Sequence, residues 1–394
     1  MPQFLHAHAT HPDAHLALAL AGAQIEAQRA ALGPRSRWQP SIGWLYLTEA
    51  YVDAADSLLT EAQQRWPGVQ WLGASGVGVC ASGVEYFDEP ALSLMLADLP
   101  AEQFHLFSGR QPLGHWPAAL AQLHGDPNNS DLQALITDLA GHVSSGYVFG
   151  GLAAGRKQAI HIADGVWHGG LSGVAFGAGI GISSRVSQGC QALGATRRIS
   201  ACEGQWLTEL DGQPALDCLL QDLALPLPTA GGDLREAVPR LRRCLAGLSE
   251  PQQGTARRSD YGAEVTVRHL MGIDPARRAV AVGEQLHVGQ LLSFCERNPE
   301  AARRDLLRIC TELRDEAEDR AALASNGSSP IAGALYISCA GRGGSHFGAP
   351  SAELQWIRHA LGDVPLTGFF AAGEIAHDKL YGYTGVLTVF LKHH

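Results

Sequence analysis

Three segments of the chain share one glycine-containing plan, and this repetition limits the folds that the sequence can adopt. Each segment begins with β-prone residues and carries two glycines a few positions apart, at residues 69–78, 145–155 and 364–374. A helical pattern precedes each segment and a strand-like run follows it. We therefore predict an α/β protein (mixed α+β) of two related halves, with β-sheets flanked by helices and internal helix-plus-strand-pair repeats.

The remaining sequence predicts further local elements. A strand is expected over residues 4–10, followed by a helix to residue 32. Turn residues predict one hairpin at Asp211-Gly212 and another that joins 265–271 to 279–282. Helices outside the repeats are expected over 214–223, 233–247 and 299–320.

Composition and charge exclude several classes of protein. Apolar residues make up 46% and charged residues 17% of the 394 residues, which excludes a disordered chain. The formal net charge is −10 and the arginines are scattered, so a basic surface for nucleic acid or an anionic membrane is missing. We therefore expect no nucleic-acid partner and no membrane partner.

One uncharged stretch, residues 165–184, has the length of a membrane span. Seven of its twenty residues are glycine, which lowers helix propensity, so a buried glycine-rich strand pair is predicted instead. The eight cysteines include no pair closer than twelve positions, and the sequence opens without a basic region and an apolar run. These features favour a cytoplasmic protein with free thiols.

The glycines of residues 150–155 resemble a phosphate-binding loop at first sight. Such a loop needs a lysine directly after its last glycine and then a hydroxyl, whereas Arg156 and Gln158 stand near these places. The segment is better explained as a strand end packed tightly against its neighbour.

His6 and His8 lie on the same face of a predicted strand, and His11 and His15 follow. A metal hydrolase would need further ligands on later strands of a barrel, which the repeat pattern does not provide. We expect packed or surface roles for these histidines, and no metal ligands.

The C-terminal sixty residues contain the candidate ligand site. Cys339 ends a predicted strand, and the glycine-rich turn that follows carries Arg342, whose charge suits a carboxylate or phosphate. Glu374 ends a nearly uncharged strand, where it needs either Arg342 or a ligand as partner. The predicted ligand-binding residues are Cys339, Arg342 and Gly343 on one wall, Phe369, Gly373 and Glu374 on the other, and Gly150 and Gly151 from the first half.

These segments resemble the FIST family (F-box and intracellular signal transduction). The resemblance rests on Cys339–Gly343, Glu353, 365–375 and 380–384 for the C-terminal half, and on 72–76, 149–153, 209–217 and 268–274 for the N-terminal half and the region that joins the two. It implies a FIST N-like domain over 1–212 and a FIST C-like domain over 213–394. It also implies a sensory protein that binds small ligands such as amino acids, and some bacterial relatives are regarded as haem-containing nitric-oxide sensors that act on a histidine kinase.

The sequence thus leaves three functions open. The first is a cytoplasmic signal-transduction protein that binds a small ligand, an amino acid or another anionic metabolite, and reports to a separate partner such as a histidine kinase. No cofactor and no catalytic residue are expected in that case. The second is a haem-based sensor with His346 or His377 as the axial ligand. The third is a thiol enzyme or redox sensor that uses Cys339, with His346 as base.

Overall fold

The computed structural model describes residues 3–156, 158–226, 238–251, 265–322 and 330–392, which form two compact units. Unit 1 consists of Met1–Ser187 and Arg303–His394, and unit 2 of Gln188–Ala302. Unit 2 is therefore an insertion in the sequence of unit 1. The predicted division at residue 212 falls inside unit 2.

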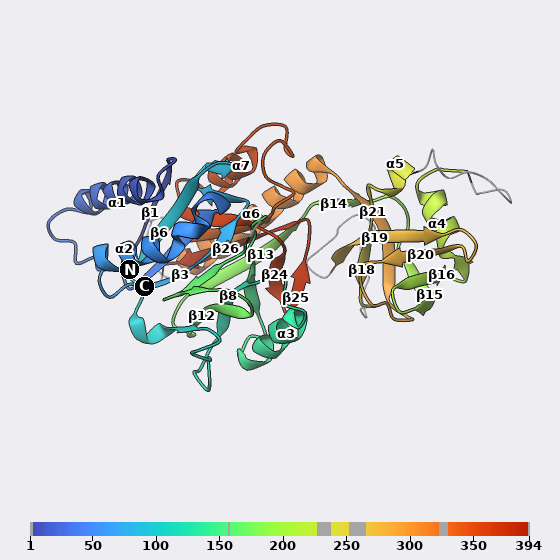
Figure 1. The fold of residues 1–394 in the computed structure, drawn as a ribbon, viewed down its shortest axis with the longest axis horizontal. Helices are drawn as coiled ribbons and strands as arrows, with labels where there is room; N and C mark the ends of the chain where they lie inside the picture. Colours follow the sequence, from blue (N-terminus) through green and yellow to red (C-terminus); the bar gives the residue numbers. More distant parts are fainter. Residues whose placement is uncertain (1–2, 157, 227–237, 252–264, 323–329, 393–394) are drawn as a thin grey trace. The chain divides into compact units, whose positions relative to one another are not determined.

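Over its described residues, unit 1 repeats one β-α-β arrangement three times (Figure 1). The first strands are β2 (Ile42–Thr48), β8 (Leu120–Gly125) and β22 (Ile331–Cys339). The helices that follow are α2 (Ala55–Arg65), α3 (Leu132–His142) and α7 (Ala352–Leu361). Each leads to a second strand parallel to the first: β3 (Gln70–Gly76), β9 (Val148–Leu152) and β23 (Leu366–Ala371). The predicted helix-plus-strand repeat is confirmed.

Each repeat also has one strand before its β-α-β arrangement, here called the early strand, and one after it, called the returning strand. The two are neighbours in the same sheet. The early strands are β1 (Phe4–Thr10), β7 (Phe104–Phe107) and β13 (Ile182–Gln188). The returning strands are β6 (Ala91–Ala97), β12 (Leu171–Phe176) and β26 (Thr384–Leu391), each antiparallel to the first strand of its repeat. Strands β12 and β13 thus lie in different sheets, so the prediction that residues 165–184 form a strand pair is wrong in its pairing.

In the described part of unit 1, each of the three sheets is completed by a hairpin from another repeat. The hairpins are β4–β5 (Gly78–Ala81 and Val84–Phe87), β10–β11 (His161–Ala163 and Val166–Trp167) and β24–β25 (Glu374–His377 and Lys379–Tyr381). Hairpin β4–β5 pairs with β23, β10–β11 with β3, and β24–β25 with β9. The exchange produces three six-stranded sheets that each contain strands from two repeats.

The repeated glycine has a steric cause. In each parallel pair, a glycine of the second strand lies so close to the first strand that a Cβ would overlap a backbone carbonyl oxygen. These contacts are Gly73 with Leu45, Gly150 with Leu123, and Gly368 with Tyr336. Because only glycine permits this approach, the periodic glycines of the sequence mark equivalent points of the three repeats.

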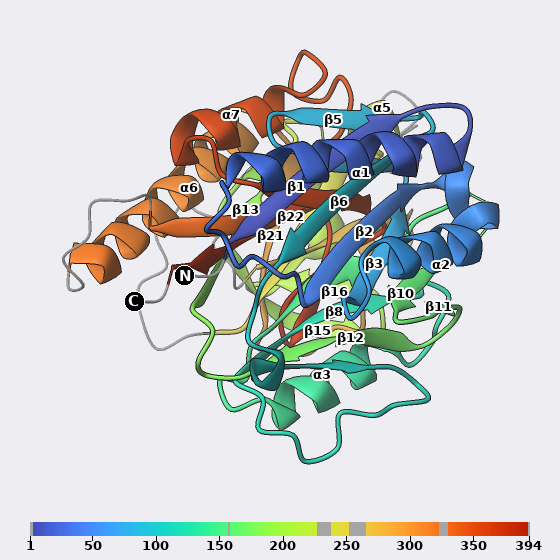
Figure 2. The same ribbon diagram turned by 90° about the vertical axis from the view of Figure 1, so that its left-hand side faces the viewer.

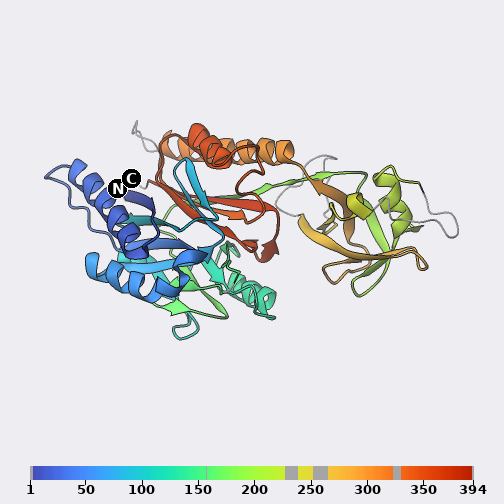
Figure 3. The same cartoon turned by 45° about the horizontal axis from the view of Figure 1, so that its top comes forward.

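Helices cover the outer faces of the sheets. Helix α1 (Ala14–Ala31) lies across β1 and β6 in Figure 2, and with α2 it packs Leu18, Ile25 and Leu58 onto that sheet. Helices α6 (Pro299–Ala322) and α7 lie side by side in Figure 3 and cover the sheet of β22 and β23. Helix α3 covers the sheet of β8 and β9. Short 3-10 helices occur at η1 (Glu49–Ala54) and η2 (Ala101–Gln103).

In its described residues, unit 2 is built around an eight-stranded antiparallel sheet. Its strands are β14 (Cys190–Ala192), β15 (Arg197–Glu203), β16 (Trp206–Leu210), β17 (Gln213–Pro214), β18 (Cys244–Ser249), β19 (Thr266–Asp274), β20 (Ala279–Val282) and β21 (Leu291–Arg297). Helices α4 (Ala215–Asp222) and α5 (Val238–Leu241) accompany them. The predicted hairpins β16–β17 and β19–β20 are confirmed.

The predicted helix over 233–247 is wrong in its described C-terminal part. Only Val238–Leu241 is helical, whereas Cys244–Ser249 forms β18 between β19 and β21. Gly247 lowers helix propensity there, and pairing on both edges stabilises the strand. Among the described residues, no helix is long and apolar enough to cross a membrane.

Candidate functional site

The structure brings together several predicted site residues where β22, β23 and β9 end. Cys339 is opposite Ala371 in the β22–β23 register, and the Gly373 carbonyl accepts a hydrogen bond from Leu152 N at 2.8 Å. Glu374 and Ile375 on β24 are opposite Gly151 and Gly150 on β9. Gly150 and Gly151 thus lie beside Glu374 in the sheet.

Arg342 lies on the other side of this sheet, against α7. Its Nε and Nη2 donate to Glu353 Oε1 at 2.8 and 2.6 Å, and both side chains are 1% exposed. Tyr336 and Ser338 also donate hydrogen bonds to the Glu353 carboxylate. Alternation along β22 points Tyr336 and Ser338 towards α7 and Cys339 away from it. Arg342 therefore forms its ion pair with Glu353 and not with Glu374.

Gly343 and Phe369 are also on opposite sides of the sheet. A Cβ at Gly343 would contact Phe87 and Phe370, on the side of α7. Phe369 stacks on Tyr46 with ring centroids 4.9 Å apart. The residues predicted to line one ligand site thus lie on both faces of the β22–β23 sheet, with Arg342 and Gly343 towards α7 and Phe369 towards Tyr46.

Glu374 is completely buried. Its Oε2 accepts hydrogen bonds from the backbone N and Oγ1 of Thr384 at 3.1 and 2.6 Å, while Oε1 is buried without a partner. Burial raises the pKa of this carboxyl to about 8. Because Arg342 and Glu374 are both fully buried, neither side chain borders an accessible hollow in this structure.

Cys339 is in surroundings that favour the thiol over the thiolate. Burial raises its pKa to about 12, with a further contribution from the neighbouring Glu374 carboxyl. The nearby Arg342 guanidinium acts in the opposite direction and is outweighed. These surroundings argue against Cys339 as a nucleophile near neutral pH.

A polar cluster lies beside Phe369 in the interior. Gln122 accepts a hydrogen bond from Trp44 Nε1 at 2.8 Å and donates one to Tyr46 OH at 2.9 Å. Tyr46 OH is 3.2 Å from His124 Nε2, and burial lowers the pKa of His124 to about 3. The histidine is therefore neutral, and the cluster joins the first two repeats by hydrogen bonds within the core.

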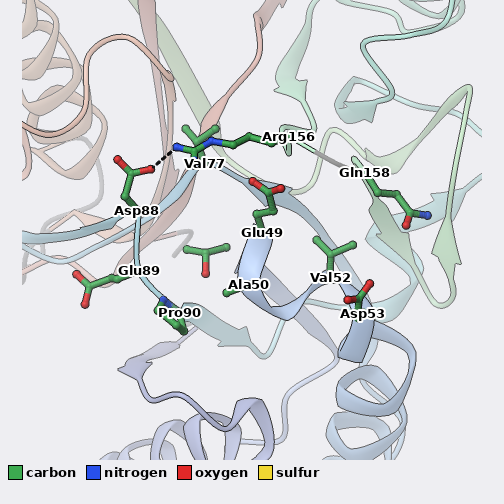
Figure 4. Close-up of a pocket in the computed structure, with 11 residues that line it drawn as sticks. Glu49, Ala50, Val52, Asp53, Val77, Asp88, Glu89, Pro90, Arg156 and Gln158 are labelled. Atoms are coloured by element: carbon green, nitrogen blue, oxygen red, sulfur yellow. Dashed lines mark hydrogen bonds and ion pairs between the residues drawn. The ribbon is translucent and has the colours of Figure 1, made fainter.

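An open cavity of about 640 Å³ lies at the C-terminal ends of β2 and β3. Thr48 is the last residue of β2, and Val77 follows β3. The loop after β9 contributes Arg156 and Gln158 from the second repeat (Figure 4). The other lining residues are Glu49, Ala50, Val52 and Asp53 of η1, and Asp88, Glu89 and Pro90 after β5.

The charged residues that line this cavity are mainly acidic. In the part that the structure describes, Glu49, Asp53, Asp88 and Glu89 accompany one guanidinium, that of Arg156. Arg156 Nη2 is 2.9 Å from Asp88 Oδ1, and the two side chains are 79% and 60% exposed. An ion pair this exposed contributes little stability, so a ligand carboxylate can replace Asp88 at the guanidinium. The acidic groups suit a positively charged group beside it.

Sequence reasoning missed this cavity because it selected the third repeat. Gly73 approaches Leu45 and Gly368 approaches Tyr336, so Leu45 and Tyr336 occupy equivalent positions of the first and third repeats. Thr48 and Cys339 each lie three positions further along the strand, so they are equivalent as well. The predicted site and the cavity therefore occupy equivalent strand ends of different repeats. In the sequence, Arg156 stands where a phosphate-binding loop would need a lysine, and its place beside η1 depends on tertiary structure.

The cavity does not fit the haem alternative. None of its described lining residues is a histidine, cysteine, methionine or tyrosine, the side chains that ligate haem iron. His377 is exposed at the end of β24, with its ring 4.8 Å from that of Tyr147, and His346 packs against Phe347. Among the described residues, no group of three or more His, Cys, Asp or Glu side chains could hold a metal ion.

Known proteins match almost the whole chain. Residues 41–213 match the FIST N domain and residues 215–377 the FIST C domain. The uncharacterized protein Rv0628c of Mycobacterium tuberculosis is 31% identical over 405 residues, covering 97% of this chain and 98% of that protein. The uncharacterized protein Mb0898c of Mycobacterium bovis is 30% identical over 401 residues, covering 97% of both chains.

Proposed function

The chain belongs to the FIST family, whose domains are sensory domains of signal transduction, and we propose that its cavity at the ends of β2 and β3 binds a small zwitterion, an amino acid. Binding is reported to a separate signalling protein, for which the family resemblance suggests a histidine kinase. We place both events in the cytoplasm, as the free cysteines suggest. The observation that carries the proposal is the combination of several carboxylates with Arg156 in one open cavity.

The position of the cavity supports binding. In open α/β sheets, ligands bind outside the carboxyl ends of parallel strands, and β2 and β3 are such a pair. The loop after β9 closes one side, so residues of two repeats would contact the same ligand. A ligand in this cavity would thereby link the two repeats.

The charges support a ligand with both signs. Arg156 would bind the carboxylate of the amino acid through its planar guanidinium. Asp53 and Glu49, on η1, would attract the ammonium group. Among the described lining residues, four carboxylates accompany the one guanidinium of Arg156, which disfavours ligands that carry only negative charge.

Titration calorimetry with amino acids, amines and dicarboxylates tests the proposal. Arg156→Ala should weaken amino-acid binding about tenfold or more, the value of a charge-assisted hydrogen bond. Asp53→Asn should weaken binding of amino acids and amines alike. Arg29→Ala is the matched control, because it removes an exposed arginine of α1 that pairs with Glu26.

A thermal-unfolding screen extends the test to unknown ligands. A ligand at one hundred times its Kd should stabilise the protein by about 2.7 kcal/mol. If the whole panel leaves the unfolding temperature unchanged, the binding proposal fails. Dicarboxylate binding that survives Arg156→Ala would assign the site to another part of the chain.

A further inference from the structure

Ser57, His15 and Glu61 form a hydrogen-bonded series on the surface of unit 1. Ser57 Oγ is 3.2 Å from His15 Nε2, and His15 Nδ1 is 2.8 Å from Glu61 Oε2. Ser57 and Glu61 are four residues apart on α2, so they share one face of the helix. His15 reaches between them from the first turn of α1.

We propose that these three residues form an acyl-transfer site that is separate from the ligand cavity. A hydroxyl next to an imidazole, with a carboxylate on the second ring nitrogen, is the arrangement that activates a serine nucleophile. Ser57 is the nucleophile, His15 the general base, and Glu61 the positioning residue that fixes the histidine ring. The sequence indicated neither Ser57 nor Glu61, because they meet His15 only in the folded chain.

The reaction follows from the geometry. Ser57 Oγ forms a bond to the carbonyl carbon of an ester while its proton moves to His15 Nε2. The bond from that carbon to the alcohol oxygen breaks, and the alcohol leaves with the proton from His15. Water then attacks the acyl-serine, again with His15 as base, and releases the carboxylic acid and free Ser57.

Exposure determines the substrate class. His15 and Glu61 side chains are 51% and 30% exposed, and Ser57 is exposed, so the site has no deep binding cleft. Activated esters with a good leaving group, such as aryl acetates, need the least additional stabilisation of the transition state. We therefore assign the site to small activated carboxylic esters.

The contacts also indicate which protonation state is reactive. Ser57 Oγ is 2.8 Å from the Ala54 carbonyl, to which its hydroxyl can donate when His15 is protonated. Neutral His15 can instead accept the hydroxyl proton at Nε2. Asp13 and Glu61 both face His15, and Arg65 donates to the other Glu61 oxygen at 3.3 Å. The reaction requires the neutral histidine.

The test is labelling of the full chain with an aryl acetate and a fluorophosphonate, followed by peptide mass spectrometry. Acetyl and phosphonyl groups should appear on Ser57, and Ser57→Ala should abolish this labelling. His15→Ala should slow acylation about a hundredfold, the usual contribution of a general base, and added imidazole should restore part of the rate. Glu61→Gln should slow it about tenfold, and Glu61→Asp should retain more of it.

Matched controls separate catalysis from general surface reactivity. Ser130→Ala removes another exposed serine, and His142→Asn removes an exposed histidine that pairs with Asp138. Both variants should label Ser57 at the wild-type rate. Labelling that spreads over many serines, or that persists at Ser57 unchanged in His15→Ala, would overturn the proposal. Circular dichroism verifies that each variant is folded.

Discussion

Arg342, in the turn after β22, forms a buried ion pair with Glu353 of α7, with Nη2 and Oε1 2.6 Å apart and both side chains 1% exposed. Arg342 also extends to Ser187 Oγ at 3.3 Å, and its guanidinium lies 5.3 Å from the Phe347 ring centroid. Tyr336 and Ser338 satisfy the remaining capacity of the carboxylate. The pair therefore fixes the glycine-rich turn onto α7, which is a structural role for the residue that the sequence suggested for a ligand.

Removing one member of this pair should be strongly destabilising. Arg342→Ala or Glu353→Gln leaves an uncompensated buried group, which costs about 3–5 kcal/mol. Urea denaturation measures the loss. The control is Arg358→Ala on the same helix, whose exposed pair with Asp363 should contribute less than about 1 kcal/mol. Equal losses for the two arginines would contradict the structural role.

Glu374 should make stability depend on pH in a specific direction. Burial raises its pKa from 4.5 to about 8, so the folded protein holds this proton more tightly than the unfolded chain. The stabilisation is complete below pH 4.5 and is lost as the pH rises towards 8, by at most about 1.4 kcal/mol per pH unit. Glu374→Gln should lack this slope in urea denaturation series. A variant with an unchanged slope would show that Glu374 does not cause it.

The strand glycines should not tolerate a methyl group. Gly368→Ala and Gly73→Ala place a Cβ against a carbonyl oxygen of the neighbouring strand, so each should cost about 1–3 kcal/mol or more. Gly141→Ala is the control, because a Cβ at this position on α3 meets no atom within 4 Å. That substitution should stabilise the helix by about 0.5–1 kcal/mol. Thermal unfolding distinguishes the two signs.

Cys339 should react slowly with alkylating reagents. Since burial raises its pKa to about 12, the thiolate is scarce at neutral pH. Iodoacetamide labelling near pH 7, read by peptide mass spectrometry, should modify the less buried Cys202 before Cys339. Rapid labelling of Cys339 would instead restore the thiol-enzyme hypothesis.

Local patterns predicted the first repeat well. Strand β1, helix α1 and strand β3 lie within a few residues of their expected positions, because apolar periodicity and turn residues act over short distances. The repetition of the glycine-containing segments was also visible in the sequence. The hairpin exchange was not, because pairing of β4 with β23 joins residues far apart in the chain.

The site was harder to predict for the same reason. Strand alternation alone would have placed Cys339 and Ser338 on opposite faces, but the direction of Arg342 depends on where α7 presents Glu353. The cavity requires η1, the turn after β5 and the loop after β9 to meet, and no spacing in the sequence encodes that meeting. Buried partners and open cavities are properties of tertiary packing.

Because of the exchanged hairpins, the folding of each of the three repeats depends on the other two. If the first repeat were removed, β23 would lose its pairing with β4, and β10 would lose its pairing with β3. Fragments divided at residue 212 would expose such unpaired strands, which readily join other chains. Unit 1 should consequently unfold in one cooperative transition, and the two FIST parts should aggregate when they are produced separately.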